Sequence, residues 1–236
     1  MSVDYSLCKL YTPDACAAAI VDHLAHSGEL RSEHRIHEPH AGGGSFIRAL
    51  ERFNVHITAA DLAPDEGVTV YGKPVTQADF LAWTPDLKDQ PDWLVGNPPY
   101  TGAEDHIRHA LATTKRHVVF VLRLAMLEGV HRSQHLWKET PLREVIVLAP
   151  RPSFTSNGHT DTKTAYAAFW WDKQWKAPPQ VAWLNWKKRS QPCTAYKPSS
   201  KTWSRQQPST TMPARMRWAP PSHAWSQLSA RPTKCP

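Results

Sequence analysis

Residues 35–61 read RIHEPHAGGGSFIRALERFNVHITAAD, and this stretch contains the order of signals that decides the fold. A short run at Arg35-Ile36-His37-Glu38 comes first, and the glycine cluster Gly42-Gly43-Gly44 follows it. Ser45 to Phe53 then has a helix-like pattern, and Val55 to Ala60 is a second strand candidate. This order predicts two parallel strands that are joined by a helix.

The alternation of strand-like and helix-like segments continues through the rest of the first 190 residues. Thr12-Pro13-Asp14 has a capping residue followed by Pro at the first helical position, and it predicts a helix through Ala25. We therefore expect an α/β fold, a Rossmann-like, mostly parallel sheet with helices on both faces. The further strand candidates are Thr69 to Ala78, Trp93 to Val95, His117 to Leu124, Val145 to Leu148 and Ala165 to Trp171, and the further helices are Ala103 to Lys115 and Glu128 to Lys138.

The composition predicts a soluble, intracellular protein. The chain has 236 residues, of which 41% are hydrophobic, enough for one sizeable core. No window approaches the roughly 18 apolar residues of a membrane span, and charged residues such as Asp4 and Lys9 occupy the place of a signal peptide. The 4 cysteines have no spacing typical of zinc sites, so neither a metal nor a disulfide framework is predicted.

The last 50 residues have a different composition from the rest of the chain. Residues 187–236 contain ten of the 28 Lys and Arg residues and none of the 21 Asp and Glu residues. They also contain no glycine and no apolar periodicity. We expect a folded domain over residues 1–186 and a disordered basic tail over 187–236. The charge suits a polyanion, but solvated charge without a partner or a shifted reading frame would also explain it.

Polar or glycine signals follow four of the predicted strands. They are Gly42–Gly44, Asp61, Asp79 and Asn97-Pro98-Pro99-Tyr100. In open parallel sheets, ligands bind where the carboxyl ends of the strands meet. Glycines let a ligand approach the backbone, and an acid about 20 residues later accepts hydrogen bonds from ribose hydroxyls. The pattern therefore predicts a nucleoside-containing cofactor at this edge of the sheet.

Glu38 narrows the choice of cofactor. A dinucleotide-binding motif would have a third glycine at position 47, where this chain has Ile47. The carboxylate of Glu38 would also repel a pyrophosphate. It suits a ligand with a positive sulfonium and ammonium, which points to S-adenosylmethionine.

The segment Glu38-Pro39-His40-Ala41-Gly42-Gly43-Gly44-Ser45-Phe46, followed by Asn97-Pro98-Pro99-Tyr100, resembles class I S-adenosylmethionine-dependent N6-adenine DNA methyltransferases of phages and restriction systems. The resemblance covers roughly residues 5–186. It implies a seven-stranded sheet whose last strand is antiparallel, S-adenosylmethionine as the cofactor, and methyl transfer to the 6-amino group of adenine in DNA. It also implies a cytoplasmic enzyme of a bacterium or a phage-infected cell, and it leaves the oligomeric state open.

The resemblance assigns roles to individual cofactor-binding residues. Thr12 matches a motif that contacts the methionine carboxylate, although an ordinary helix cap is the alternative. Asp61 matches the acid on the ribose, Asp79 the acceptor for the adenine amino group of the cofactor, and Phe80 the ring that packs on that adenine. The implied cofactor-binding residues are Tyr11, Thr12, Glu38, Ala41, Gly42, Gly43, Gly44, Asp61, Leu62, Asp79, Phe80 and Asn97.

The Asn97-Pro98-Pro99-Tyr100 loop suits catalysis on an adenine amino group, whose lone pair is delocalised into the ring. If the Asn97 side-chain oxygen and the Pro98 carbonyl each accept one amino hydrogen, the lone pair can point at the methyl group. Pro98 and Pro99 stiffen the loop, and Tyr100 can stack on a flipped or single-stranded base. A turn that ends a strand is the alternative interpretation of the same residues.

Three more residues are candidates for substrate binding. Arg123 lies in an apolar run and would form either a structural ion pair or a phosphate contact. Phe154 and Asp161 belong to a loop that follows a predicted strand, and this loop would either touch the target base or its phosphates or serve as an ordinary hairpin.

Two other functions remain open at this stage. The first is an amino-methyltransferase that acts on an RNA base or on a protein glutamine side chain. The second, from another class, is a non-catalytic nucleic-acid-binding protein that uses the basic tail.

Overall fold

The computed structural model describes residues 11–156, 159–161 and 163–187. The predicted basic tail lies outside the described residues apart from Lys187, so its disorder stays a prediction. Within the described ranges, no helix is long and apolar enough to cross a membrane.

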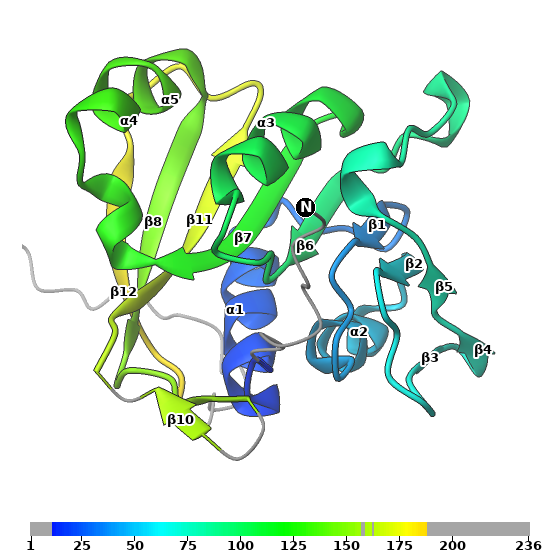
Figure 1. The fold of residues 1–236 in the computed structure, drawn as a ribbon. Helices are drawn as coiled ribbons and strands as arrows, with labels where there is room; N and C mark the ends of the chain where they lie inside the picture. The colour runs from blue at the N-terminus through cyan, green and yellow to red at the C-terminus, as the bar shows by residue number, and fades with distance from the viewer. Residues whose placement is uncertain (1–10, 157–158, 162, 188–236) are drawn as a thin grey trace, which may run out of the picture. The chain divides into compact units, whose positions relative to one another are not determined.

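An eight-stranded sheet forms the centre of the described domain (Figure 1). Its strand order is β12-β8-β11-β7-β6-β1-β2-β5. Neighbouring strands are parallel except at β11, which is antiparallel to both β7 and β8. The strands are β1 Arg35–Glu38, β2 His56–Asp61, β5 Thr76–Gln77, β6 Trp93–Gly96, β7 His117–Arg123, β8 Leu142–Ala149, β11 Tyr166–Asp172 and β12 Gln180–Asn185.

Helices cover both faces of the sheet, as the alternating pattern predicts. The core on one face includes the buried side of α1 (Asp14–His26) and α2 (Ser45–Leu50). The core on the other face includes α3 (Ala103–Thr113) and Leu136 of the short helix α5 (Leu136–Glu139). Because both faces are covered, β11 is buried throughout and β7 is buried up to Leu122, and the Rossmann-like α/β fold is confirmed.

The sheet has one strand more than the seven that the family resemblance implies. The additional strand β12 pairs in parallel with β8 and forms the edge of the sheet, whereas the antiparallel strand β11 lies between β7 and β8. Along β12, positions of lower and higher exposure alternate from Ala182 to Asn185. An edge strand with one solvated face needs fewer apolar residues than a central strand, which is why its sequence signal is weak.

Two predicted elements are interrupted in the structure. The strand expected over Thr69 to Ala78 is wrong: a hairpin of β3 (Thr69–Val70) and β4 (Lys73–Pro74) precedes the short β5. Its turn contains Tyr71 and Gly72, both with positive φ, which a continuous strand cannot contain. The helix expected over Glu128 to Lys138 is split into α4 (Val130–Gln134) and α5.

The remaining elements are short. The 3₁₀ helices are η2 Glu51–Phe53, η3 Phe80–Ala82, η4 Leu87–Asp89 and η5 Leu124–Leu127, and a separate hairpin pairs β9 (Phe154–Ser156) with β10 (His159–Asp161).

A network of ion pairs surrounds Asp172, the last residue of β11. Asp172 is 1% exposed and accepts two hydrogen bonds from Arg116, each 3.0 Å long, and one from Arg143 at 3.1 Å. Burial alone would raise the pKa of Asp172. The hydrogen bonds from Arg116 and the positive charges around the carboxylate outweigh burial and lower this pKa below its usual value. Arg143 also donates to Glu29, so the network joins β8 and β11 to the segment after α1.

Candidate active site

The predicted site residues converge at the carboxyl ends of β1, β2 and β6. These three strands are parallel neighbours, with β1 between the other two. Glu38 is the last residue of β1 and the glycine loop follows it, Asp61 is the last residue of β2, and Asn97 to Tyr100 follow β6. Residues from three distant parts of the chain are thus gathered at one sheet edge, as the strand order requires.

Hydrogen bonds hold the glycine loop Ala41–Gly44 in place. The amide of Ala41 donates to the Ala60 carbonyl at 3.0 Å, and the amide of Gly42 donates to Asp61 Oδ2 at 2.8 Å. Gly44 has φ +78°, and a Cβ there would lie 2.8 Å from a Val68 methyl carbon, so only glycine fits. Asp61 therefore orients this loop.

Ser45 and Arg48, which the sequence did not single out, also anchor this loop. Arg48 donates to the Gly43 carbonyl at 2.7 Å and to Asp14 at 2.6 Å. Ser45 Oγ donates to the Thr12 carbonyl at 2.6 Å and lies 2.7 Å from Asp14 Oδ1. The start of α1 and the start of α2 are held together through these groups.

Tyr11 and Thr12 lie against the glycine loop. A Cβ on Gly43 would lie 3.0 Å from a ring carbon of Tyr11, so the tyrosine ring lies over the loop. Partial burial, a hydrogen bond to Asp65 and the nearby acids raise the pKa of Tyr11 to about 12. Thr12 does not cap α1: the capping position is Pro13, and no side-chain cap bond is present there. Its buried Oγ1 has no hydrogen-bond partner among the described residues.

Glu38 is a buried acid at the end of β1, with 1% of its surface exposed. Within the described ranges, neither carboxylate oxygen meets a donor in good hydrogen-bond geometry. Burial raises the pKa of Glu38 well above its usual value, and the His40 amide offsets only part of this. A Cβ on Gly96 would lie 2.5 Å from Glu38 Oε1, so the carboxyl group lies against the residue that precedes Asn97.

The Asn97–Tyr100 loop begins where β6 ends, and its tyrosine ring points into the protein. The Tyr100 ring centroid lies 5.6 Å from that of Tyr166, and the Arg123 guanidinium carbon lies 4.9 Å from the Tyr100 centroid. Burial, together with Tyr166, raises the pKa of Tyr100, and a hydrogen bond from Asn97 acts in the opposite direction. One face of the Tyr100 ring is therefore covered by a cation in this structure.

Arg123 and Phe154 differ from their predicted surroundings. Arg123 is exposed at the end of β7, and among the described carboxylates it has no ion-pair partner; it contacts the Tyr100 ring instead. Phe154 is fully buried and packs edge-on against Tyr166 at 4.4 Å, so it belongs to the core. Asp161 lies on β10, in a stretch whose side chains the structure does not describe. A cavity of about 200 Å³ lies beside Tyr100 and Arg123 and is also lined by Ala103, Leu122, Ala125, Met126 and Arg132.

Asp79, Phe80 and Leu62 complete the predicted cofactor set. Asp79 Oδ1 accepts a hydrogen bond from the Leu81 amide at 3.0 Å, which makes it the cap of η3. Phe80 is 4% exposed, with its ring among imidazoles of His40, His106 and His109. Leu62, in contrast, is 49% exposed beside Asp61. The ring of Phe80 is thus part of a packed cluster, which the sequence did not predict.

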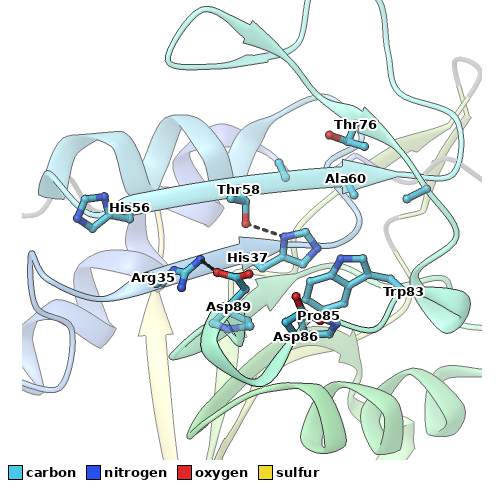
Figure 2. Close-up of a pocket in the computed structure, with 13 residues that line it drawn as sticks. Arg35, His37, His56, Thr58, Ala60, Thr76, Trp83, Pro85, Asp86 and Asp89 are labelled. Atoms are coloured by element: carbon cyan, nitrogen blue, oxygen red, sulfur yellow. Dashed lines mark hydrogen bonds and ion pairs between the residues drawn. The ribbon is translucent and has the colours of Figure 1, made fainter.

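A larger cavity of about 340 Å³ lies on the face of β1 and β2 (Figure 2). His37 lines this cavity. Its Nδ1 and Thr58 Oγ1 form a hydrogen bond 2.9 Å long, and its ring stacks on the ring of Trp83 with centroids 4.3 Å apart. None of the predicted site residues lines this cavity.

The predicted residues lie instead at the strand ends, so we place the candidate active site there, with the buried acid Glu38, the glycine loop and Asn97. Among the residues with described side chains, no cluster of three or more His, Cys, Asp or Glu could hold a metal ion.

Comparison with known proteins identifies the fold. No protein-family model and no curated protein matches the chain. Among solved structures, it is similar to the methyltransferase subunit of a type I restriction-modification system from Streptococcus thermophilus, with TM-score 0.55, 18% identity and coverage of 70% of this chain and 45% of that one. A protein of Vibrio vulnificus YJ016, named as the modification subunit of a type I restriction enzyme, matches with TM-score 0.54 and 14% identity over 77% of this chain and 48% of that one.

A shorter protein of Pyrococcus horikoshii, named as an RNA methyltransferase, matches with TM-score 0.53 and 13% identity over 72% of this chain and 90% of that one. The chain spans less than half the length of each of the two restriction-modification subunits. At these identities the similarity concerns the fold alone, and the chain has the fold that methyltransferases use.

Proposed function

We propose that this protein uses S-adenosylmethionine to methylate the 6-amino group of adenine in DNA. The observation that carries the proposal is the buried carboxyl group of Glu38, which has no well-placed donor among the described residues and lies against Gly96, the residue before Asn97. A buried acid without a partner is costly unless a ligand compensates it. A cationic ligand at this edge of the sheet would do so.

The residues at the strand ends fit this cofactor. The unpartnered Oγ1 of Thr12 can donate to a carboxylate, and Glu38 can neutralise a cationic group. Asp61 is held by two backbone amides, those of Gly42 and Ala63, and each of its oxygens keeps a lone pair for a ribose hydroxyl. When bound, the cofactor supplies a methyl group activated by its sulfonium.

Asn97 and Pro98 would orient the adenine amino group. Two neutral acceptors that are fixed before the reaction draw the amino hydrogens to one side, and no strong general base is then needed. The Asn97 side chain interacts with Tyr100 of the same loop. A base that stacks on Tyr100 would either displace Arg123 or enter between the ring and the guanidinium.

DNA is the substrate that we favour, because the loop sequence resembles adenine DNA methyltransferases and two structural neighbours are named as restriction-modification subunits. The experiment is methyl transfer from tritium-labelled S-adenosylmethionine to unmethylated genomic DNA, with total RNA and a protein extract in parallel. Mass spectrometry of digested DNA should detect N6-methyladenine. Label in RNA or protein alone would contradict the DNA assignment, and cofactor binding without any transfer would favour a non-catalytic protein.

Gly96→Ala should weaken S-adenosylmethionine binding by more than about tenfold. The backbone conformation at Gly96 suits alanine, because its φ is not positive. The added Cβ would, however, push the Glu38 carboxyl group from its position. Glu38→Gln should have a similar effect, because it removes a charge-assisted contact of about 1.5–3 kcal/mol. Calorimetry measures both dissociation constants.

Glu144→Gln is the matched control for the loss of a partly buried acid. Glu144 bonds to His23 at 3.1 Å on the outer part of the sheet, and its replacement should leave cofactor affinity unchanged. If Gly96→Ala and Glu38→Gln bind the cofactor as tightly as the wild type does, Glu38 is not part of the binding site.

The basic tail is proposed to contact DNA phosphates. Replacing Lys201, Arg205, Arg215 and Arg217 with glutamine should reduce the slope of log affinity against log salt by about 0.9 for each lost phosphate contact. Fluorescence anisotropy with a DNA duplex measures this slope, and the affinity for S-adenosylmethionine serves as the control. An unchanged slope would show that these residues of the tail do not contact DNA phosphates.

A further inference from the structure

Two histidines connect the glycine loop to the helix that follows the Asn97–Tyr100 loop. Nε2 of His40 lies 2.9 Å from Nδ1 of His106, and the two residues are 66 positions apart in the chain. His40 directly precedes Ala41 of the glycine loop, and His106 lies in the first turn of α3, which begins at Ala103. The hydrogen bond therefore joins the residue before the glycine loop to the helix that follows the Asn97–Tyr100 loop.

Aromatic rings hold both imidazoles. The ring of His40 packs edge-on against Phe80 at 5.1 Å and against Phe120 at 5.6 Å, and the ring of His106 stacks on Phe80 at 5.7 Å. His106 is 7% exposed. Neither imidazole can change its position without disturbing Phe80, so the geometry of the bond is well defined.

The surroundings keep both rings neutral. Burial lowers the pKa of His40 well below its usual value, and the neighbouring His106 and His37 add to this. Burial also lowers the pKa of His106 to about 4, although Asp79 and Asp105 act against it and His109 acts with it. Two neutral imidazoles form one N–H···N hydrogen bond, with one ring as the donor and the other as the acceptor.

The second nitrogen of His40 lies near Gly96, the last residue of β6. Nδ1 is buried and has no partner among the described residues. It lies 3.5 Å from the position that a Cβ on Gly96 would take, close to where Glu38 Oε1 also lies. His40 is thus in contact with the carboxyl ends of both β1 and β6, and His106 determines how its ring is oriented.

We propose that His106 is a positioning residue, which acts through His40 to hold the glycine loop in the conformation that binds S-adenosylmethionine. The inference rests on the proposed function, because it concerns the same cofactor. A loop with three successive glycines has high conformational freedom, and ordering it on binding costs free energy. A link to the rigid helix α3 lowers this cost before the cofactor arrives.

The test compares His106→Phe with His106→Asn by calorimetry with S-adenosylmethionine. Phenylalanine retains a ring against Phe80 but has no nitrogen, and binding should weaken by about 3- to 10-fold, which corresponds to the loss of one hydrogen bond. Asparagine places an amide group near the position of Nδ1, so affinity should return to within about twofold of the wild type.

His109→Phe is the matched control. His109 lies one turn further along α3, also contacts the Phe80 ring at 4.8 Å, and bonds to the Trp83 carbonyl at 2.8 Å rather than to the glycine loop. It should lower the melting temperature about as much as His106→Phe does, yet leave cofactor affinity unchanged. In a His40→Phe background, His106→Phe should have no further effect on affinity, because the bond is already absent.

The outcomes separate the two proposals. A wild-type protein that binds no S-adenosylmethionine overturns the proposed function. A wild type that binds, together with His106→Phe that binds equally well, overturns the positioning role alone. The role is also wrong if His106→Asn is as weak as His106→Phe, or if the effects of His40→Phe and His106→Phe are additive.

Discussion

Replacing Asn97 with alanine is expected to reduce methyl transfer to DNA by about 10²–10³-fold, the usual effect of removing one preorganised polar contact. The loop should keep its shape, because Pro98 and Pro99 restrain it and the Tyr100 ring remains packed against Tyr166 and Arg123. Cofactor affinity and melting temperature should change little. Single-turnover transfer of a labelled methyl group measures the effect on the chemical step.

Two further variants make this result specific. In Asn97→Asp the carboxylate still accepts a hydrogen bond but brings a charge that must be desolvated beside the base, so partial activity is expected. Asn185→Ala is the control, because Asn185 lies at the carboxyl end of the edge strand β12, opposite Ala149 of β8. If Asn97→Ala keeps full activity, or loses it only by unfolding, the loop is a strand-ending turn and not the catalytic element.

The second large effect is a loss of stability between about pH 6.5 and pH 5. Burial lowers the pKa of each of three histidines, His37, His106 and His117, to about 4. In the unfolded chain they take up protons near pH 6.5, so the unfolded state binds more protons as the pH falls through this window. Each of these histidines should then destabilise the fold by about 2 kcal/mol at pH 5, a large part of a typical total of 5–15 kcal/mol.

Other groups titrate outside this window or oppose the effect. The pKa of Asp172 is lowered by its arginine partners, so the stability that it contributes is present above about pH 4 and is lost only as the pH falls further. The pKa of Glu38 is raised, so the folded state takes up its proton first and gains stability as the pH falls. The burial of His40 acts in the same direction as that of the other three histidines, whereas Glu38 is a single acid that acts in the opposite direction.

Urea unfolding at about pH 7.5, 6.5 and 5 measures this dependence. His37→Phe keeps a ring against Trp83 and should make the loss of stability between the highest and lowest pH about 2 kcal/mol smaller. His131→Phe, at an exposed position of α4, is the control and should leave the pH dependence as it is. A wild type that is equally stable at the highest and the lowest of these pH values would show that the buried histidines do not control acid stability.

The local pattern of apolar and turn residues was sufficient to predict the order of most elements and that the candidate residues lie at one edge of the sheet. β1, β2 and β6 are parallel neighbours, so the residues that follow them had to meet. Glu38, Asp61 and Asn97 could therefore be selected from the sequence without any knowledge of side-chain contacts. Their place at the carboxyl ends of strands follows from the alternation of strands and helices, which short-range periodicity indicates, whereas the pairing of β6 with β1 is a property of the tertiary structure.

The tertiary structure decided what those residues contact. The bond between His40 and His106, the guanidinium of Arg123 over Tyr100 and the burial of Phe154 against Tyr166 each join segments that are separated in the chain. No periodicity encodes such pairs, because a side chain's neighbours across a core depend on the packing of elements and on their exact register. The same holds for β12, which joins the sheet only because the edge of β8 is available to pair with it.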